Sequence, residues 1–171
     1  FDLAKEFLKE DLAVSAFDSF IPIDDESVVL GQNLIEEKIK EAYIVICPYA
    51  TNLHKGRNKE WPFWRDFCAK YTGKKIVAVV SESDYARCCI EFPELLVLSN
   101  TLAVSAFIMR EAELVLANDS GAMHLASFFG ANVIGLFGAT EINKTRPWYG
   151  SYKVGADNEF ISVQDLLKTL V

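Results

Sequence analysis

The sequence predicts an α/β domain built on a doubly wound parallel sheet. Its 171 residues suit a single domain of ordinary size, and 51% of them are hydrophobic, which supplies a sizeable core. From residue 43 onward, short apolar runs alternate with stretches of helical character. The runs are nearly continuous rather than alternating, a pattern typical of parallel strands that are covered on both faces.

Five apolar runs are expected to form the strands, and the segments between and after them the helices. The predicted strands are 43–47, 75–80, 95–98, 114–117 and 132–137. The predicted helices are 61–71, 84–91, 102–112, 121–129 and 163–170. Ser162 and Asp165 have the spacing of a capping box at the start of the last helix, with Asp in place of Glu. In such sheets ligands bind beyond the carboxyl ends of the strands.

The first 42 residues have a different pattern from the rest. They predict an acidic amphipathic helix over 4–12, a connection through 21–26, and another helix over 33–42. The acids at 24–26 are interpreted as solvated side chains rather than metal ligands. We assign 1–42 to an interdomain linker and the end of a preceding domain, and 43–171 to the α/β domain.

Composition excludes several classes of function. The net charge of −7 and a pI of about 4.9 argue against a nucleic-acid-binding surface. No apolar run approaches the roughly 18–20 residues of a membrane span. The four cysteines have apolar neighbours and no CxxC spacing, so we expect reduced thiols, as in a cytoplasmic protein. The two histidines lie far from any cysteine pair, and no metal site is expected.

The strongest chemical signal follows the fourth predicted strand. Asp119 and Ser120 form a turn, Gly121 opens a helix, and His124 lies one turn later on the face of Ser120. Exposed N–H groups and the positive end of the helix dipole favour a diphosphate here, and Gly121 lets it approach the backbone. The alternative is that Asp119 and Ser120 only cap the helix while His124 packs in the core.

A basic loop follows the first predicted strand. Lys55, Arg57 and Lys59 gather here in an otherwise acidic protein, and Thr51 and Asn52 add short hydrogen-bond donors. At a carboxyl strand end such a loop is well placed to neutralise a leaving diphosphate. A solvated loop without a ligand remains the alternative.

Two further strand ends carry weaker signals. Gly138 and Thr140 follow the fifth strand and predict the second side of a phosphate cradle, although Gly138 could equally be structural. Glu82 follows the second strand, where a carboxylate can accept hydrogen bonds from ribose hydroxyls. Glu82 could equally be an ordinary acid at a helix start. The GxGxxG, Walker A, GxSxG and HExxH motifs are absent.

Taken together, these segments resemble glycosyltransferase family 9, the heptosyltransferases, across residues 43–150. The matching motifs are PYA at 48–50, KEWP at 59–62, DSGAMH at 119–124 and LFGAT at 136–140. Tyr49 departs from the family's usual Gly, and Ala139 departs from its usual Pro. These departures bear on the choice of donor sugar and base more than on the fold.

The resemblance implies a GT-B enzyme, of which this chain would be the C-terminal, Rossmann-like, donor-binding domain. The implied activity is inverting transfer of heptose, with ADP-heptose as donor and the lipopolysaccharide inner core as acceptor. No metal or other cofactor is implied. The acceptor and the general base would lie on the other domain, so we expect little transfer activity from this chain alone. The implied location is cytoplasmic, with at most peripheral contact at the inner membrane.

The resemblance also implies roles for individual residues. Lys59 would stabilise the leaving diphosphate, and Asp119 would contact the sugar, as preorganised electrostatic catalysis requires. The implied substrate-binding residues are Thr51, Asn52, Glu82, Ser120, Gly121, His124, Gly138 and Thr140. Three other readings remain open: an epimerase-like GT-B enzyme, a non-catalytic nucleotide-binding module, and a Rossmann-like domain for another ligand. The Lys-x-Trp-Pro motif disfavours the first, and the missing glycine fingerprint disfavours the last.

Overall fold

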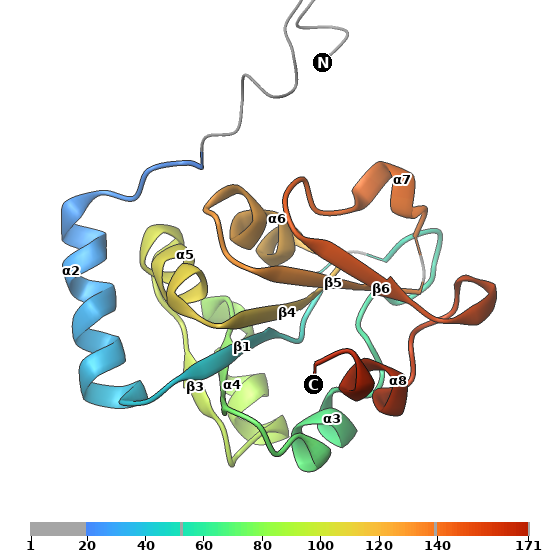
Figure 1. Cartoon of the computed structure of the whole chain (residues 1–171), viewed down its shortest axis with the longest axis horizontal. Helices are drawn as coiled ribbons and strands as arrows, with labels where there is room; N and C mark the ends of the chain where they lie inside the picture. The colour runs from blue at the N-terminus through green and yellow to red at the C-terminus, as the bar shows by residue number, and fades with distance from the viewer. Residues whose placement is uncertain (1–19, 52, 139, 171) are drawn as a thin grey trace, which may run out of the picture.

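The computed structural model describes residues 20–51, 53–138 and 140–170 (Figure 1). Within them an all-parallel, six-stranded sheet has the order β3-β2-β1-β4-β5-β6. The strands are β1 (Tyr43–Cys47), β2 (Lys75–Val79), β3 (Leu96–Leu98), β4 (Leu114–Asn118), β5 (Val133–Phe137) and β6 (Ser151–Val154). The helices are α2 (Asp25–Leu34), α3 (Trp64–Lys70), α4 (Glu82–Glu91), α5 (Leu102–Glu111), α6 (Gly121–Phe128), α7 (Ile142–Thr145) and α8 (Val163–Lys168). A π-helical turn η2 (Ile35–Ile39) extends α2, and a 3-10 turn η3 (Ala156–Asn158) precedes α8.

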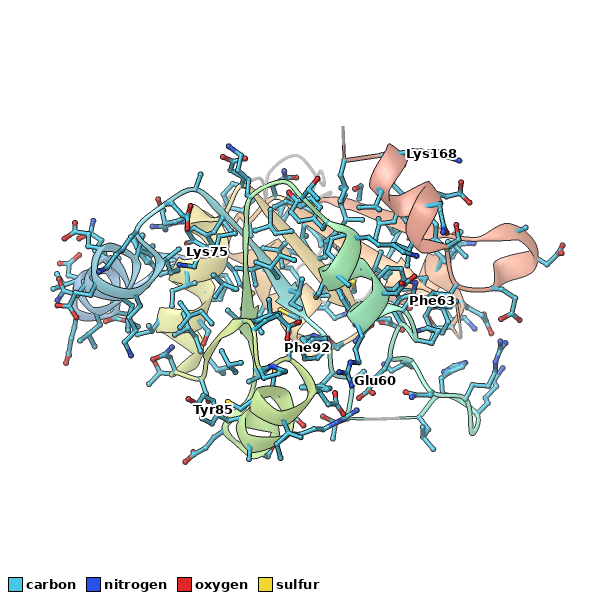
Figure 2. All side chains as sticks on the ribbon, turned by 90° about the horizontal axis from the view of Figure 1, so that it is seen from below. Glu60, Phe63, Lys75, Tyr85, Phe92 and Lys168 are labelled. Atoms are coloured by element: carbon cyan, nitrogen blue, oxygen red, sulfur yellow. The ribbon has the colours of Figure 1, made fainter. Side chains whose placement is uncertain are left out.

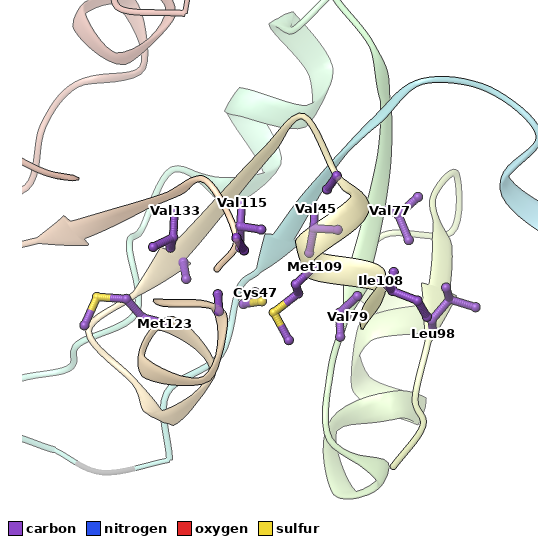
Figure 3. Packing of buried hydrophobic residues seen from close by; sticks show 14 of the residues in the cluster. Val45, Cys47, Val77, Val79, Leu98, Ile108, Met109, Val115, Met123 and Val133 are labelled. Atoms are coloured by element: carbon purple, nitrogen blue, oxygen red, sulfur yellow. The ribbon is translucent and has the colours of Figure 1, made fainter. Parts of the chain in front are cut away.

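Helices cover both faces of the sheet, as the continuous apolar strands predict. Helices α5 and α6 lie on one face, and α3, α4 and α8 on the other (Figure 1). In β1, Val45 and Cys47 pack towards the first group while Ile44 and Ile46 pack towards the second. Figure 3 shows the first of these cores, where strand valines meet Met109 and other side chains from the helices. The four inner strands, β1, β2, β4 and β5, are therefore buried on both sides, which confirms the predicted class of fold.

The five predicted strands are all present, with ends that differ by no more than one residue. Strand β6 was missed, because Ser151–Val154 lies at the sheet edge and its residues are exposed or half-buried. Such a strand carries no continuous apolar run for a sequence pattern to reveal. At α8 the capping prediction is confirmed, since the Ser162 hydroxyl accepts a hydrogen bond from the Asp165 N–H at 3.2 Å.

The connection expected through residues 21–26 ends earlier than predicted, because α2 begins at Asp25 rather than near residue 33. Asp24 is the N-cap of α2, and its Oδ1 accepts a hydrogen bond from the Ser27 N–H at 2.9 Å. Helix α2 packs closely on α5: a methyl group at Gly31 would come within 2.3 Å of Phe107. The helix predicted over 4–12 lies outside the described residues.

The strand order reverses between β1 and β4, which places a crevice at their carboxyl ends. The two strands end side by side, with Cys47 paired in register with Ala117. The loop after β1 and the turn before α6 therefore face each other across this crevice. Open α/β sheets bind their ligands at such a switch point. No helix in the described ranges combines the length and apolarity needed to cross a membrane.

Candidate functional site

A cavity of about 590 Å³ opens at this switch point. The loop after β1, the end of β2, and residues along α5 and α6 supply most of its walls. Thr51, Lys59, Ser120, Gly121 and His124 all line it, so the structure brings together five of the ten predicted site residues. Asn52 lies outside the described residues.

Asn118, the last residue of β4, holds the loop after β1 against the sheet. The buried Asn118 Oδ1 accepts hydrogen bonds from the Trp61 N–H at 2.8 Å and the Trp64 Nε1–H at 3.2 Å. Its amide group donates to the Cys47 carbonyl at 3.4 Å. Trp61 is only 1% exposed, and its Nε1–H donates to the Ile161 carbonyl at 2.8 Å. The tryptophan of the Lys-x-Trp-Pro motif is therefore a buried anchor of the loop.

Lys59 is brought to Asp119 by this anchored loop. The Lys59 Nζ lies 3.7 Å from the Asp119 Oδ2, and the two side chains are 17% and 5% exposed. The Asp119 Oδ2 is buried and has no hydrogen-bond partner among the described residues. Lys59 and Ser120 line the cavity, and Asp119 lies next to both of them without lining it itself. A buried carboxylate with one loose ionic partner is incompletely compensated, and such groups concentrate at functional sites.

The turn before α6 presents further unused polar groups. Ser120 is the N-cap residue of α6 by position, yet its side chain makes no capping hydrogen bond. Its Oγ is buried and without a partner among the described residues. A methyl group at Gly121 would meet nothing within 4 Å, so space is open in front of the helix end. The simple capping interpretation therefore fails, because the Ser120 hydroxyl is left free to bind an anion at the helix N-terminus.

The end of β2 differs in detail from the prediction. Glu82 is exposed at the start of α4 and does not line the cavity. Ser81 and Asp84 line it instead, and the Ser81 hydroxyl donates to the Asp84 Oδ2 at 2.6 Å. Sequence reasoning missed Asp84, although the spacing of three residues from Ser81 places both on one side of the helix start.

Gly138 and Thr140 lie at a second cavity, of about 520 Å³, together with His54, Lys55 and Arg57. The basic loop is thus divided, with Lys59 at the first cavity and the other basic residues at the second. Lys55 Nζ lies 3.7 Å from a Glu141 carboxylate oxygen, and Arg57 pairs with Glu159 at 3.0 Å. A methyl group at Gly138 would come within 2.4 Å of the Phe160 ring, which explains that glycine structurally.

The described residues contain no cluster of three or more His, Cys, Asp or Glu side chains that could hold a metal ion. The four cysteines are free thiols. Burial raises the pKa of Cys47 to about 12 and that of Cys88 to about 11. Both thiols therefore stay protonated near neutral pH and are poor nucleophiles.

Several solved glycosyltransferases are similar in structure to this chain. ADP-heptose LPS heptosyltransferase II from Escherichia coli superposes with a TM-score of 0.70 at 18% identity, over 94% of this chain and 54% of that one. E. coli heptosyltransferase WaaC with ADP gives 0.65 at 17% identity, over 82% and 48%. The family 9 glycosyltransferase from Veillonella parvula gives 0.68 at 17% identity, over 87% and 51%. The fold is the Rossmann-like α/β fold found in these GT-B enzymes.

The particular family follows from the sequence match. The model of glycosyltransferase family 9 (heptosyltransferase) matches residues 1–162, and the chain belongs to this family. The comparison with individually curated proteins gives no match. The chain spans about half the length of the solved heptosyltransferases that it matches.

Proposed function

We propose that this chain binds the nucleotide-sugar donor, of the ADP-heptose type, for inverting transfer of heptose to a lipopolysaccharide or lipooligosaccharide inner core. One observation carries the proposal. Two buried polar atoms, the Asp119 Oδ2 and the Ser120 Oγ, have no hydrogen-bond partner among the described residues, beside Lys59 and at the N-terminus of α6. Family membership and the solved complex of a relative with ADP support the same donor class.

In the proposed mechanism Lys59 neutralises the charge that develops on the departing diphosphate. The N–H groups at the start of α6 and the Ser120 hydroxyl hold the phosphate oxygens, and His124 adds a side-chain donor. Asp119 accepts a hydrogen bond from a sugar hydroxyl and keeps the Lys59 ammonium in place. Electrostatic stabilisation of a leaving group is effective when such groups are held in place before the donor binds, and the bond from Trp61 to Asn118 supports this for the loop that carries Lys59.

The nucleoside end of the donor would lie between the ends of β2 and α5. Val80, Leu102 and Met109 supply apolar surface to this part of the cavity. Ser81 and Asp84 supply oxygen atoms that can accept hydrogen bonds from ribose hydroxyls. We assign the ribose to Asp84 in place of Glu82, because Glu82 lies outside the cavity.

The acceptor and the general base belong to the part of the enzyme that this chain does not represent. Because the chain covers about half of its solved relatives, acceptor recognition is assigned to a second, N-terminal domain. We expect this chain alone to bind donor and to transfer little. A cytoplasmic location with at most peripheral membrane contact belongs to the same proposal.

The test is a calorimetric titration of the chain with ADP, UDP, GDP and CDP, each in the presence of EDTA and again with added Mg²⁺. We expect selective binding of ADP that does not depend on the metal. Selective binding of another diphosphate would keep the donor site and change the donor. Binding of none of the four would contradict the proposal that this chain carries a preformed donor site.

A further inference from the structure

Arg87, on α4, forms hydrogen bonds to the loop that carries Lys59. Arg87 donates from Nη1 to the Glu60 Oε1 at 3.1 Å and from Nη2 to the Glu60 Oε2 at 3.0 Å. Its Nε donates to the Glu91 Oε1 at 3.0 Å. Figure 2 shows Glu60 between α3 and α4. The contact is bidentate, the arrangement in which an arginine–carboxylate pair is strongest.

Tyr49 joins the same network from the other end of the loop. The Arg87 guanidinium lies 4.1 Å from the centre of the Tyr49 ring, within range of a cation–π contact. The Tyr49 hydroxyl donates to the Glu91 Oε2 at 2.8 Å, and the Ala50 N–H points to the Glu60 Oε1 at 3.4 Å. Both ends of the loop after β1 are thus fixed to one guanidinium and its two carboxylates.

Lys59 lies between anchored neighbours. Glu60, the next residue, is held by Arg87, and its N–H donates to the Asn58 Oδ1 at 3.0 Å. Trp61, one residue further, is held by Asn118. The position of the Lys59 backbone, and hence the reach of its ammonium towards Asp119, depends on these anchors.

The Arg87 network can hold the loop only if its interactions are stronger than those of an ordinary surface ion pair. A single exposed ion pair contributes little, because solvent screens it and two long side chains must be ordered. Here the Arg87 side chain is 46% exposed but Glu60 only 18%, and three acceptors and a ring hold one guanidinium. A bidentate network of this kind is the recognised exception to that rule.

We propose that Arg87 is a positioning residue of the donor site, acting through Glu60 to hold Lys59 in place for the diphosphate. The inference rests on the proposed donor-binding function. Arg87 does not line the donor cavity, so its influence must pass through the loop. Tyr49, which stands where the family usually has glycine, supplies the ring on which the guanidinium lies.

The experiment compares Arg87→Met with the matched control Arg110→Met on α5. Arg110 also pairs with a glutamate, Glu111, at 3.2 Å and lies over an aromatic ring, that of Phe107, at 5.0 Å. Calorimetric titrations measure ADP and AMP affinity for each variant of the chain. We expect Arg87→Met to weaken ADP binding about five- to tenfold, with little effect on AMP, and Arg110→Met to change neither.

A double variant tests the route of the effect. If Arg87 acts by positioning Lys59, then Arg87→Met in a Lys59→Ala background should cause no further loss of ADP affinity. A further loss equal to that in the wild-type background would overturn the inference. Arg87→Lys keeps the charge and loses the bidentate contact, so it should show part of the defect, and it replaces the methionine variant if that one fails to fold.

A readout without ligand separates this inference from the proposed function. Hydrogen–deuterium exchange should become faster over residues 48–63 in Arg87→Met and stay unchanged there in Arg110→Met. Faster exchange in a chain that binds no nucleoside diphosphate would support the loop anchor and defeat the donor-binding proposal. Unchanged exchange over the loop would overturn the role of Arg87 whatever the nucleotide result.

Discussion

At the end of β4, Asn118 differs in its physical role from the next two polar residues, Asp119 and Ser120. Asn118 is buried and fully engaged, because it bonds to the backbone of two segments and to one indole. The Asp119 Oδ2 and the Ser120 Oγ are buried as well, but they lack hydrogen-bond partners among the described residues. Buried groups of the first kind stabilise a fold, whereas those of the second kind cost stability unless a ligand completes them.

Asp119→Asn should separate these two roles. The amide keeps the shape but removes a buried carboxylate that has one loose partner, so the thermal midpoint should stay the same or rise. Affinity for the nucleotide sugar should fall more than affinity for ADP, because only the sugar meets Asp119 in the proposed complex. Calorimetry of unfolding and titration with both ligands check this. Equal losses for the two ligands would contradict the sugar contact and would show that Asp119 acts only by positioning Lys59.

Asn118→Ala should instead destabilise the protein. It leaves the Trp61 N–H and the Trp64 Nε1–H without their acceptor in the core, at a cost of about 2–4 kcal/mol in the free energy of unfolding. Asn132→Ala is the matched control, since Asn132 is exposed and its side chain donates a hydrogen bond to the Glu113 carbonyl at 2.9 Å, at the surface. Urea denaturation of both variants measures the difference. Similar midpoints for the two would contradict the anchoring role of Asn118.

At the scale of elements, sequence patterns succeed where burial is uniform and fail where partners lie far apart in the chain. The five strands β1 to β5 are predictable because each forms a nearly continuous apolar run in the sequence. The edge strand β6 has no such pattern, and the start of α2 depends on an Asp24 cap that resembles a solvated acid in sequence. The start of α6 at Ser120 and Gly121 is predictable, because the residues that mark a helix N-terminus are neighbours in the sequence.

The remaining features of the site could not be predicted, because they depend on contacts between residues that are far apart in the sequence. The separation of Lys55 and Arg57 from Lys59 follows from the path of one loop over two strand ends. The bond from Asn118 to Trp61 spans 57 residues, and the Arg87–Glu60 pair spans 27. Local spacing carries no signal for such contacts.

Gly150 fixes the turn that leads into β6, and Gly150→Ala tests how far this edge strand depends on it. Gly150 has a φ of +105°, and an added methyl group would lie 2.6 Å from the Val133 carbonyl oxygen. Strain and clash together should cost about 2–4 kcal/mol. Gly56→Ala is the matched control: its φ is +78°, but nothing lies within 4 Å, so only about 1 kcal/mol is expected. Equal losses in urea denaturation would show that the clash is relieved at no cost.

At the scale of the whole molecule, titrating groups predict how stability falls in acid. The hydrogen bond from the Ser27 N–H lowers the pKa of Asp24 below its ordinary 3.8. Burial raises the pKa of Glu91, but hydrogen bonds from Tyr49 and Arg87 outweigh it and leave the pKa below the ordinary 4.5. A carboxylate whose pKa is lowered by folding adds stability above its unfolded pKa and loses it as the pH falls. Stability should therefore drop below about pH 4.5.

The buried thiols predict that stability also falls at alkaline pH. Burial raises the pKa of Cys47 and of Cys68 from 9.0 to about 12, and that of Cys88 to about 11. The unfolded chain then releases these protons first, so stability is full below pH 9 and is lost as the pH rises further. Urea denaturation between pH 3 and pH 11 should give a plateau with two falling sides.

Two substitutions assign the two sides of this plateau to particular groups. Asp24→Asn retains a good helix cap but cannot titrate, so it should make the acid side shallower while changing stability at pH 7 little. Cys47→Ala removes a thiol that is 2% exposed, so it should make the alkaline side shallower, at a modest cavity cost that is the same at every pH. An acid side unchanged by Asp24→Asn would show that other carboxylates govern the loss. A buried thiol whose pKa is raised by folding must contribute to the loss of stability at alkaline pH. An alkaline side unchanged by Cys47→Ala would therefore show that the pKa of Cys47 is not raised, and that other groups cause the loss.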